Sequence, residues 1–163
     1  MPELKLQSLR IDSAIDREIR RHGEETYPHE CCGALVGVPG HATTTVALPN
    51  TTEEGPRRRF LVRPSDYRLA EQRAQELGGE LIGFYHSHPD HPARPSQYDL
   101  DHAWPTFAYI IVAVKGDHDP SAADQGSAGL PRRSAEGAKA GDMSVWFLKE
   151  DRSAFEEGEL NGD

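Results

Sequence analysis

The sequence predicts a single domain of the α+β or α/β type, in which a mixed central sheet is flanked by helices. Short apolar or alternating segments, typical of strands, recur along the chain and are separated by longer amphipathic segments, typical of helices. These segments do not follow the regular strand–helix–strand repeat of a purely parallel sheet. The 163 residues, of which 36% are hydrophobic and 28% charged, suffice for one sizeable core and fall short of two.

The segments expected to form strands are apolar or alternate apolar with polar residues. They are Leu4–Ile11, Gly33–Val38, Thr43–Leu48, Arg59–Val62, Glu80–His88, Phe107–Lys115 and Met143–Leu148. Phe107–Lys115 is the most apolar of them, so we place it at the centre of the sheet.

The expected helices are recognised by their capping residues and by apolar residues that recur on one face. The first runs from Asp12 or Ser13 to about Glu25, the second from Ser65 to the Gly78-Gly79 pair, and the third from Ser96 to about Trp104. Residues 116–141 are rich in Gly, Ala, Ser and Asp, which favours a flexible loop. The domain is expected to span residues 1–149 and to be followed by an acidic, partly disordered tail at 150–163.

Composition and charge exclude several classes of partner. No apolar run approaches the length of a membrane span, and the N-terminal residues lack a signal-peptide pattern, so we expect a cytoplasmic protein without a membrane partner. The formal net charge of −9 argues against nucleic-acid binding. The Arg57-Arg58-Arg59 run is either a solvated face or a docking patch for an acidic partner.

The cysteines are the adjacent pair Cys31 and Cys32, which offers no disulfide framework and fits a reducing compartment. A nucleophilic or metal-binding role is the functional alternative. Small residues packed at the start of a buried strand are the simpler interpretation, because free cysteines are usually buried.

The segment from His86 to Asp99 has the composition of a metal site. Side chains on a strand alternate between its two faces, so His86 and His88 point the same way while Ser87 points the other. A Pro-rich turn follows, and Ser96 begins a helix that carries Asp99 back toward the histidines. Two imidazoles and one carboxylate, with a fourth position open, are typical of catalytic zinc, whereas closed structural sites use four protein ligands.

A structural alternative explains part of this pattern. Ser96 with Asp99 three residues later also fits a capping box, in which the two side chains satisfy backbone N–H groups at a helix N-terminus. The nearby His91, Asp101 and His102 are expected to support the ligands or to be solvated, since three ligands are already present.

The same residues resemble the signature of the JAMM (MPN+) metalloproteases: an upstream Glu, His-X-His, seven residues, Ser, two residues and Asp. Glu30, His86, His88, Ser96 and Asp99 match every element. The resemblance extends from about Pro28 to Gly116 and is greatest to the small bacterial members. It implies the deaminase-like sandwich of that family.

The resemblance also implies an activity, which is hydrolysis of peptide or isopeptide bonds by zinc-activated water. One Zn²⁺ per chain would be held by His86, His88 and Asp99, with Glu30 as the general base. The hydroxyl of Ser96 can stabilise the oxyanion of the tetrahedral intermediate. Bacterial proteins of this kind act after the Gly-Gly end of a ubiquitin-like or sulfur-carrier protein, whose tail would lie along a sheet edge as an added strand.

Two other functions compete with this activity. A non-catalytic MPN-type binding scaffold is the alternative, although such relatives typically lack one or more ligands and none is missing here. A zinc deaminase would need a Pro-Cys-X-X-Cys motif, which this sequence does not contain. The physiological substrate and the oligomeric state stay open.

Overall fold

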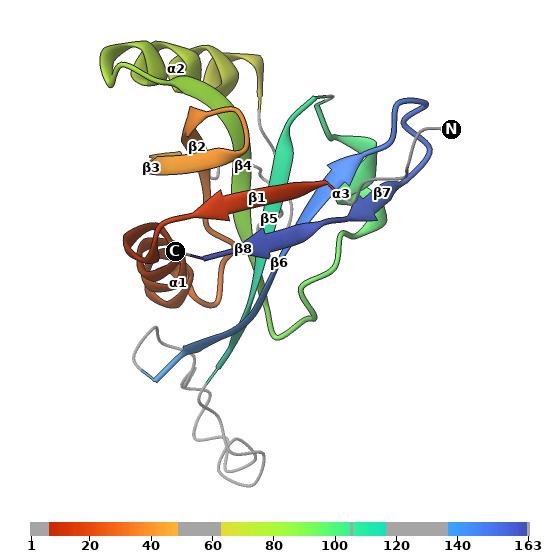
Figure 1. The fold of residues 1–163 in the computed structure, drawn as a ribbon. Helices are drawn as coiled ribbons and strands as arrows, with labels where there is room; N and C mark the ends of the chain where they lie inside the picture. The colour runs from red at the N-terminus through yellow and green to blue at the C-terminus, as the bar shows by residue number, and fades with distance from the viewer. Residues whose placement is uncertain (1–6, 49–62, 105, 117–136, 163) are drawn as a thin grey trace, which may run out of the picture.

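The computed structural model describes residues 7–48, 63–104, 106–116 and 137–162. Within these ranges the strands form one sheet in the order β7-β6-β5-β4-β2-β3-β1-β8. The strands are β1 (Ser8–Ile11), β2 (Cys32–Val38), β3 (His41–Leu48), β4 (Glu80–Pro89), β5 (Ala108–Lys115), β6 (Lys139–Leu148), β7 (Phe155–Glu157) and β8 (Glu159–Asn161). The helices are α1 (Ser13–Thr26), α2 (Pro64–Glu76) and α3 (Gln97–Asp101) (Figure 1).

The sheet is mixed, as the sequence predicts. β2 is antiparallel to both β3 and β4, and β5 is antiparallel to β6. β4 and β5 are parallel, as are the pairs of β1 with β3 and with β8. The apolar run predicted to be central forms β5, which lies between β4 and β6 and buries Ile110, Ile111 and Val112.

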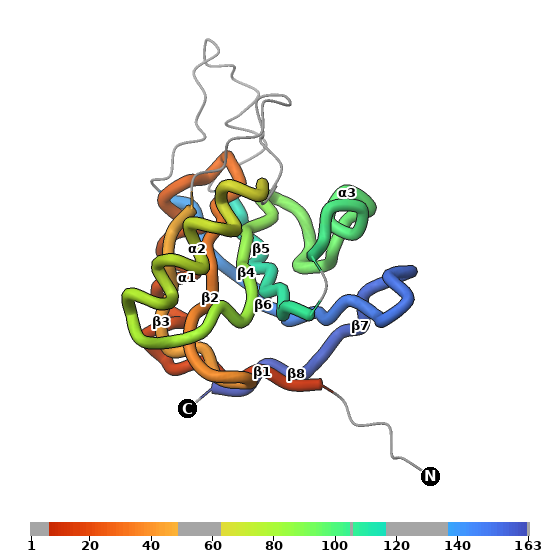
Figure 2. Tube along the Cα trace, turned by 90° about the horizontal axis from the view of Figure 1, so that it is seen from above, coloured from red at the N-terminus to blue at the C-terminus, as the bar shows by residue number. Residues whose placement is uncertain are grey.

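The two faces of the sheet carry separate cores. On one face, Ile15 and Ile19 of α1 pack with residues of β1, β2, β4, β5 and β6. On the other face, Ala70 of α2 packs with Phe84 and Tyr109 of β4 and β5. β1 and β8 lie on one side of the central strands and α3 lies on the other (Figures 1 and 2). No helix of the described ranges has the length and apolar character needed to cross a bilayer.

The prediction of a partly disordered tail is corrected by the structure. β7 pairs with β6, and β8 pairs with β1. Gly158, which separates β7 from β8, donates its N–H to the carbonyl of Val145 at 2.9 Å. The segment is acidic, but Phe155 and Leu160 pack against opposite cores. Two apolar side chains in a charged segment are too few for a strand prediction from sequence.

Other boundaries also differ. β6 begins at Lys139, inside the expected loop, and the helix expected to reach Trp104 ends at Asp101. The N–H of Trp104 donates to the Tyr109 hydroxyl oxygen at 2.5 Å instead of continuing the helix, and that hydroxyl is 3.2 Å from the Trp104 carbonyl. The strand expected at Arg59–Val62 and the arginine run before it lie outside the described residues.

Close packing of β4 against β5 depends on Gly83. A Cβ atom at this position would lie 2.2 Å from the Ala108 carbonyl oxygen, a backbone atom that cannot move aside without opening the strand pair. We therefore expect Gly83→Ala to lower the free energy of unfolding by about 3 kcal/mol, the upper part of the range for overpacking. Urea-induced unfolding followed by circular dichroism measures the change.

Gly141→Ala in β6 is the matched control, because its Cβ would approach only the Ala113 carbonyl oxygen, at 3.8 Å. The free energy of unfolding of this control is expected to stay within about 0.5 kcal/mol of the parent value. Equal losses for the two variants would contradict the packing argument.

Candidate metal centre

Strand β4 carries the two histidines of the site. Alternation along the strand places Phe84, His86 and His88 on the face covered by α2, with Tyr85 and Ser87 on the face covered by α1. Register with β2 sets Cys32 opposite His86, and register with β5 sets Ile111 beside it. Both imidazoles are buried, with exposed fractions of 1% for His86 and 7% for His88.

The loop after β4 brings Asp99 to these histidines. Ser96 caps α3: its hydroxyl oxygen accepts from the Asp99 N–H at 3.0 Å, and Asp99 Oδ2 accepts from the Ser96 N–H at 2.9 Å. The loop is also tied to β6, where the Ser144 hydroxyl donates to the Ala93 carbonyl at 2.6 Å. The capping box and the approach of Asp99 to the histidines therefore occur together.

The three side chains have the spacing of metal ligands. His86 Nε2 and His88 Nε2 are 3.2 Å apart, and Asp99 Oδ2 is 3.3 Å from the first and 3.2 Å from the second. In a tetrahedral zinc site with bonds of about 2.0–2.1 Å, the ligand atoms lie roughly 3.3–3.4 Å from one another. His86, His88 and Asp99 thus form a group that fits a zinc ion, with three ligands offered and one position open.

A hydrogen bond orients His88 for this purpose. His88 Nδ1 lies 2.9 Å from the carbonyl oxygen of Pro92, which can only accept, so Nδ1 carries the proton. In the neutral ring the lone pair is then on Nε2, the atom that faces His86 and Asp99. Such a bond to the second nitrogen is what holds a metal-binding imidazole in place.

The surroundings of Asp99 keep its carboxylate ionised. Burial alone would raise the pKa of Asp99, but the charge of His86 and hydrogen bonds from both histidines and from Ser96 hold that pKa well below its ordinary value. Burial disfavours the charged form of His88, but Asp99 outweighs this effect and raises its pKa, with a smaller contribution from Glu30. Asp99 is therefore an ionised acceptor at neutral pH.

A cavity of about 580 Å³ opens beside the group, and Glu30, His88, Ser96 and Asp99 all line it. The structure thus places these sequence-predicted residues at one site, together with His86 behind them. Glu30 comes from the connection between α1 and β2, and the residue as a whole is half-buried.

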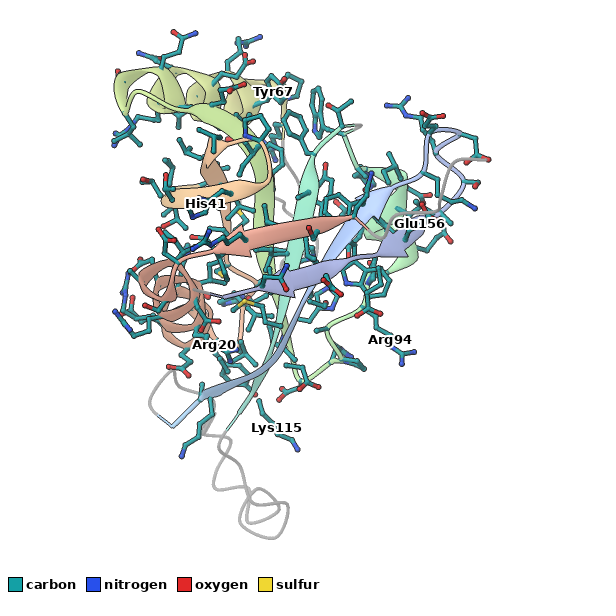
Figure 3. The ribbon with its side chains drawn as sticks, in the orientation of Figure 1. Arg20, His41, Tyr67, Arg94, Lys115 and Glu156 are labelled. Carbon is teal, nitrogen blue, oxygen red and sulfur yellow. The ribbon has the colours of Figure 1, made fainter. Side chains whose placement is uncertain are left out.

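The rest of the cavity wall consists of residues that the sequence did not single out as ligands or catalysts. His91 is exposed in the wall, and Tyr98 lines it with its ring 4.2 Å from that of His102. Arg94 also borders the cavity, although its side chain points away from the sheet (Figure 3). The Pro92 carbonyl and the Ser144 hydroxyl support the site, and their contribution depends on tertiary contacts that leave no pattern in the sequence.

Cys31 and Cys32 are buried, free cysteines at the start of β2, as the simpler interpretation predicts. Burial raises the pKa of the Cys31 thiol to about 11 and raises the pKa of Cys32 as well. We expect neither thiol of the native protein to react with iodoacetamide at pH 8, because the thiolate is the reactive form. Intact-mass measurement checks this, with the urea-unfolded protein as the control that gains both adducts; rapid native labelling would contradict it.

Known proteins resemble this chain in sequence and in fold. A family model described as prokaryotic homologs of the JAB domain matches residues 12–126. Desampylase from Haloferax volcanii is 35% identical over 92 residues, which cover 55% of this chain and 66% of that protein. A protein from Salinibacter ruber is 32% identical with a TM-score of 0.66, covering 95% of this chain and 92% of that one. A JAB1/MPN domain protein from Archaeoglobus fulgidus is 20% identical with a TM-score of 0.51, covering 96% and 98%.

The fold and the site define an α+β domain with a group of side chains suited to a metal ion. This chain belongs to the JAB/MPN family, among its prokaryotic homologs. The resemblance drawn from Glu30 and the His86–Asp99 segment is thereby confirmed, and so is the fold class. The chain spans less than two thirds of the length of the desampylase that it matches.

Proposed function

We propose that this protein is a zinc-dependent isopeptidase or peptidase. The observation that carries the proposal is the set of three donor atoms 3.2–3.3 Å apart, which shares a cavity wall with the carboxylate of Glu30. Two imidazoles and one carboxylate leave a position open for reaction, as in catalytic zinc sites. The similarity to a desampylase supports isopeptide hydrolysis as the type of reaction.

Each residue has a role that its surroundings allow. His86, His88 and Asp99 would hold one zinc ion per chain, which supplies Lewis-acid activation of water near neutral pH. Glu30 would accept the proton of the attacking water and deliver it to the leaving amine. The Ser96 hydroxyl oxygen accepts from the Asp99 N–H, so its hydrogen can donate to the oxyanion that develops on the scissile carbonyl.

The substrate that we propose is a ubiquitin-like protein whose C-terminal Gly-Gly is joined to an amine of another molecule by an isopeptide bond. The relative's name, desampylase, supports a ubiquitin-like protein. A sulfur-carrier protein extended beyond its Gly-Gly is a second substrate of the same chemistry. In both, the extended tail would bring its last carbonyl to the open position beside Glu30, with the leaving amine in the cavity.

The test uses a ubiquitin-like protein whose C-terminal glycine is linked to a lysine ε-amine of a peptide. Incubation with the zinc-loaded protein is expected to release the two components, identified by intact mass, and a chelator is expected to stop the reaction until zinc is restored. A conjugate in which Ala-Ala replaces the Gly-Gly of the tail is the matched control for the requirement for glycine. If the zinc-loaded protein bound the Gly-Gly conjugate stably but cleaved neither conjugate, the result would contradict the proposal and favour a scaffold.

A further inference from the structure

Ser87 lies between the two histidines but faces away from them. Its side chain is fully buried, with 0% exposed, on the face covered by α1. The helix approaches it closely at Gly23, where an added Cβ would lie 3.3 Å from the Ser87 Cβ atom. A hydroxyl in such a place needs a hydrogen-bond partner, because burying it without one is costly.

The partner of Ser87 is the residue next to Glu30. The Ser87 N–H donates to the Cys31 carbonyl at 3.2 Å. In a regular antiparallel ladder the Cys31 N–H would return a bond to the Ser87 carbonyl. Here it donates to the Ser87 hydroxyl oxygen, at 2.8 Å, and β2 begins one residue later, at Cys32. The side chain of Ser87 thus takes the place of a backbone acceptor at the point where the chain leaves the sheet toward Glu30.

A second attachment holds the other end of the same segment. The buried Tyr27 donates its hydroxyl to Asp90 Oδ2 at 2.6 Å. Asp90 is itself fixed to β5, since its N–H donates to the Val114 carbonyl at 2.7 Å and its Oδ1 accepts from the Gly116 N–H at 3.0 Å. Residues 27–31 are therefore attached on both sides of Glu30 to the chain that flanks His88.

We propose that Ser87 and Asp90 are positioning residues, which act through Cys31 and Tyr27 to hold the Glu30 carboxylate at the cavity that His88 and Asp99 also line. This inference rests on the proposed function, because it assumes that Glu30 is the general base. Neither residue offers an atom to the group of His86, His88 and Asp99. Their loss is therefore expected to move Glu30 and to leave the metal in place.

The test compares Ser87→Ala and Tyr27→Phe with Tyr85→Phe. Tyr85 is the matched control, because it is buried on the same strand and face as Ser87, while its hydroxyl bonds to α1, 2.7 Å from His22 Nδ1, and not to residues 27–31. We expect Ser87→Ala and Tyr27→Phe each to lower kcat by about 10- to 100-fold, since a shift of about 1 Å in a reacting group has effects of that size. KM and zinc stoichiometry are expected to stay unchanged, and Tyr85→Phe is expected to keep the parent kcat.

A double-mutant cycle separates positioning from general loss of structure. In a Glu30→Gln background, Ser87→Ala is expected to lower single-turnover cleavage by no more than twofold, because the group that it positions is already absent. Equal effects in both backgrounds, loss of zinc from Ser87→Ala, or parent-like kcat in both Ser87→Ala and Tyr27→Phe would overturn the inference. Full turnover by Glu30→Gln alone would instead overturn the proposed role of Glu30.

Discussion

Glu30→Gln is expected to lower kcat by about 10³-fold while the protein keeps its zinc, the size of effect that a general acid–base group has on proton transfer. The substitution keeps the shape of the side chain and removes its ability to accept a proton. Glu30 lines the cavity with His88 and Asp99 but lies outside the group with ligand spacing. Steady-state kinetics on the Gly-Gly isopeptide conjugate and zinc analysis of the same samples measure the two quantities together.

Glu80→Gln is the matched control for this substitution. Glu80 is an exposed acid at the other end of β4, so the variant makes the same charge change on the strand that carries the histidines. It is expected to retain both zinc and turnover. If Glu30→Gln cleaved the conjugate as fast as Glu80→Gln does, Glu30 would have no part in proton transfer.

His88→Ala is expected to weaken zinc binding by at least about 100-fold. Changing a group that only orients a ligand already weakens binding by about 10–100-fold, and this change removes a ligand atom itself. His88 Nε2 lies 3.2 Å from both His86 Nε2 and Asp99 Oδ2, so its loss leaves only two donors at the site. Competition with a zinc-sensitive dye measures the affinity, and turnover at one equivalent of zinc is expected to disappear.

His102→Ala controls for the loss of an imidazole near the site. His102 is exposed at the end of α3, where its Nδ1 is 2.9 Å from the Tyr98 carbonyl oxygen. This variant is expected to keep the zinc affinity of the parent. A His88→Ala protein that bound zinc as tightly as His102→Ala does would show that His88 is not a ligand.

Local patterns in the sequence predict much of this structure. The apolar run Phe107–Lys115 forms the central strand β5, and alternation along Glu80–His88 places His86 and His88 on one face of β4. The capping pattern of Ser96 and Asp99 marks the start of α3. These features depend on residues close together in the chain, which is why the metal group could be expected before its geometry was known.

Features that depend on distant contacts could not be predicted in the same way. β7 and β8 form in an acidic segment because β6 and β1 offer free edges, and neither edge is apparent from residues 155–161. The orientation of His88 depends on a backbone carbonyl, that of Pro92, which any residue would provide. Glu30 could be chosen among the acids of the chain only by family resemblance, since its place beside the histidines follows from the pairing of β2 with β4.

Zinc titration of the metal-free protein tests the central proposal most directly. Cleavage of the Gly-Gly isopeptide conjugate is followed at each addition, with zinc content measured in the same samples. If His86, His88 and Asp99 hold the catalytic ion, activity rises in proportion to bound zinc and reaches a plateau at one equivalent per chain. Cleavage at full rate without metal, or one tightly bound equivalent of zinc with no cleavage, would contradict it.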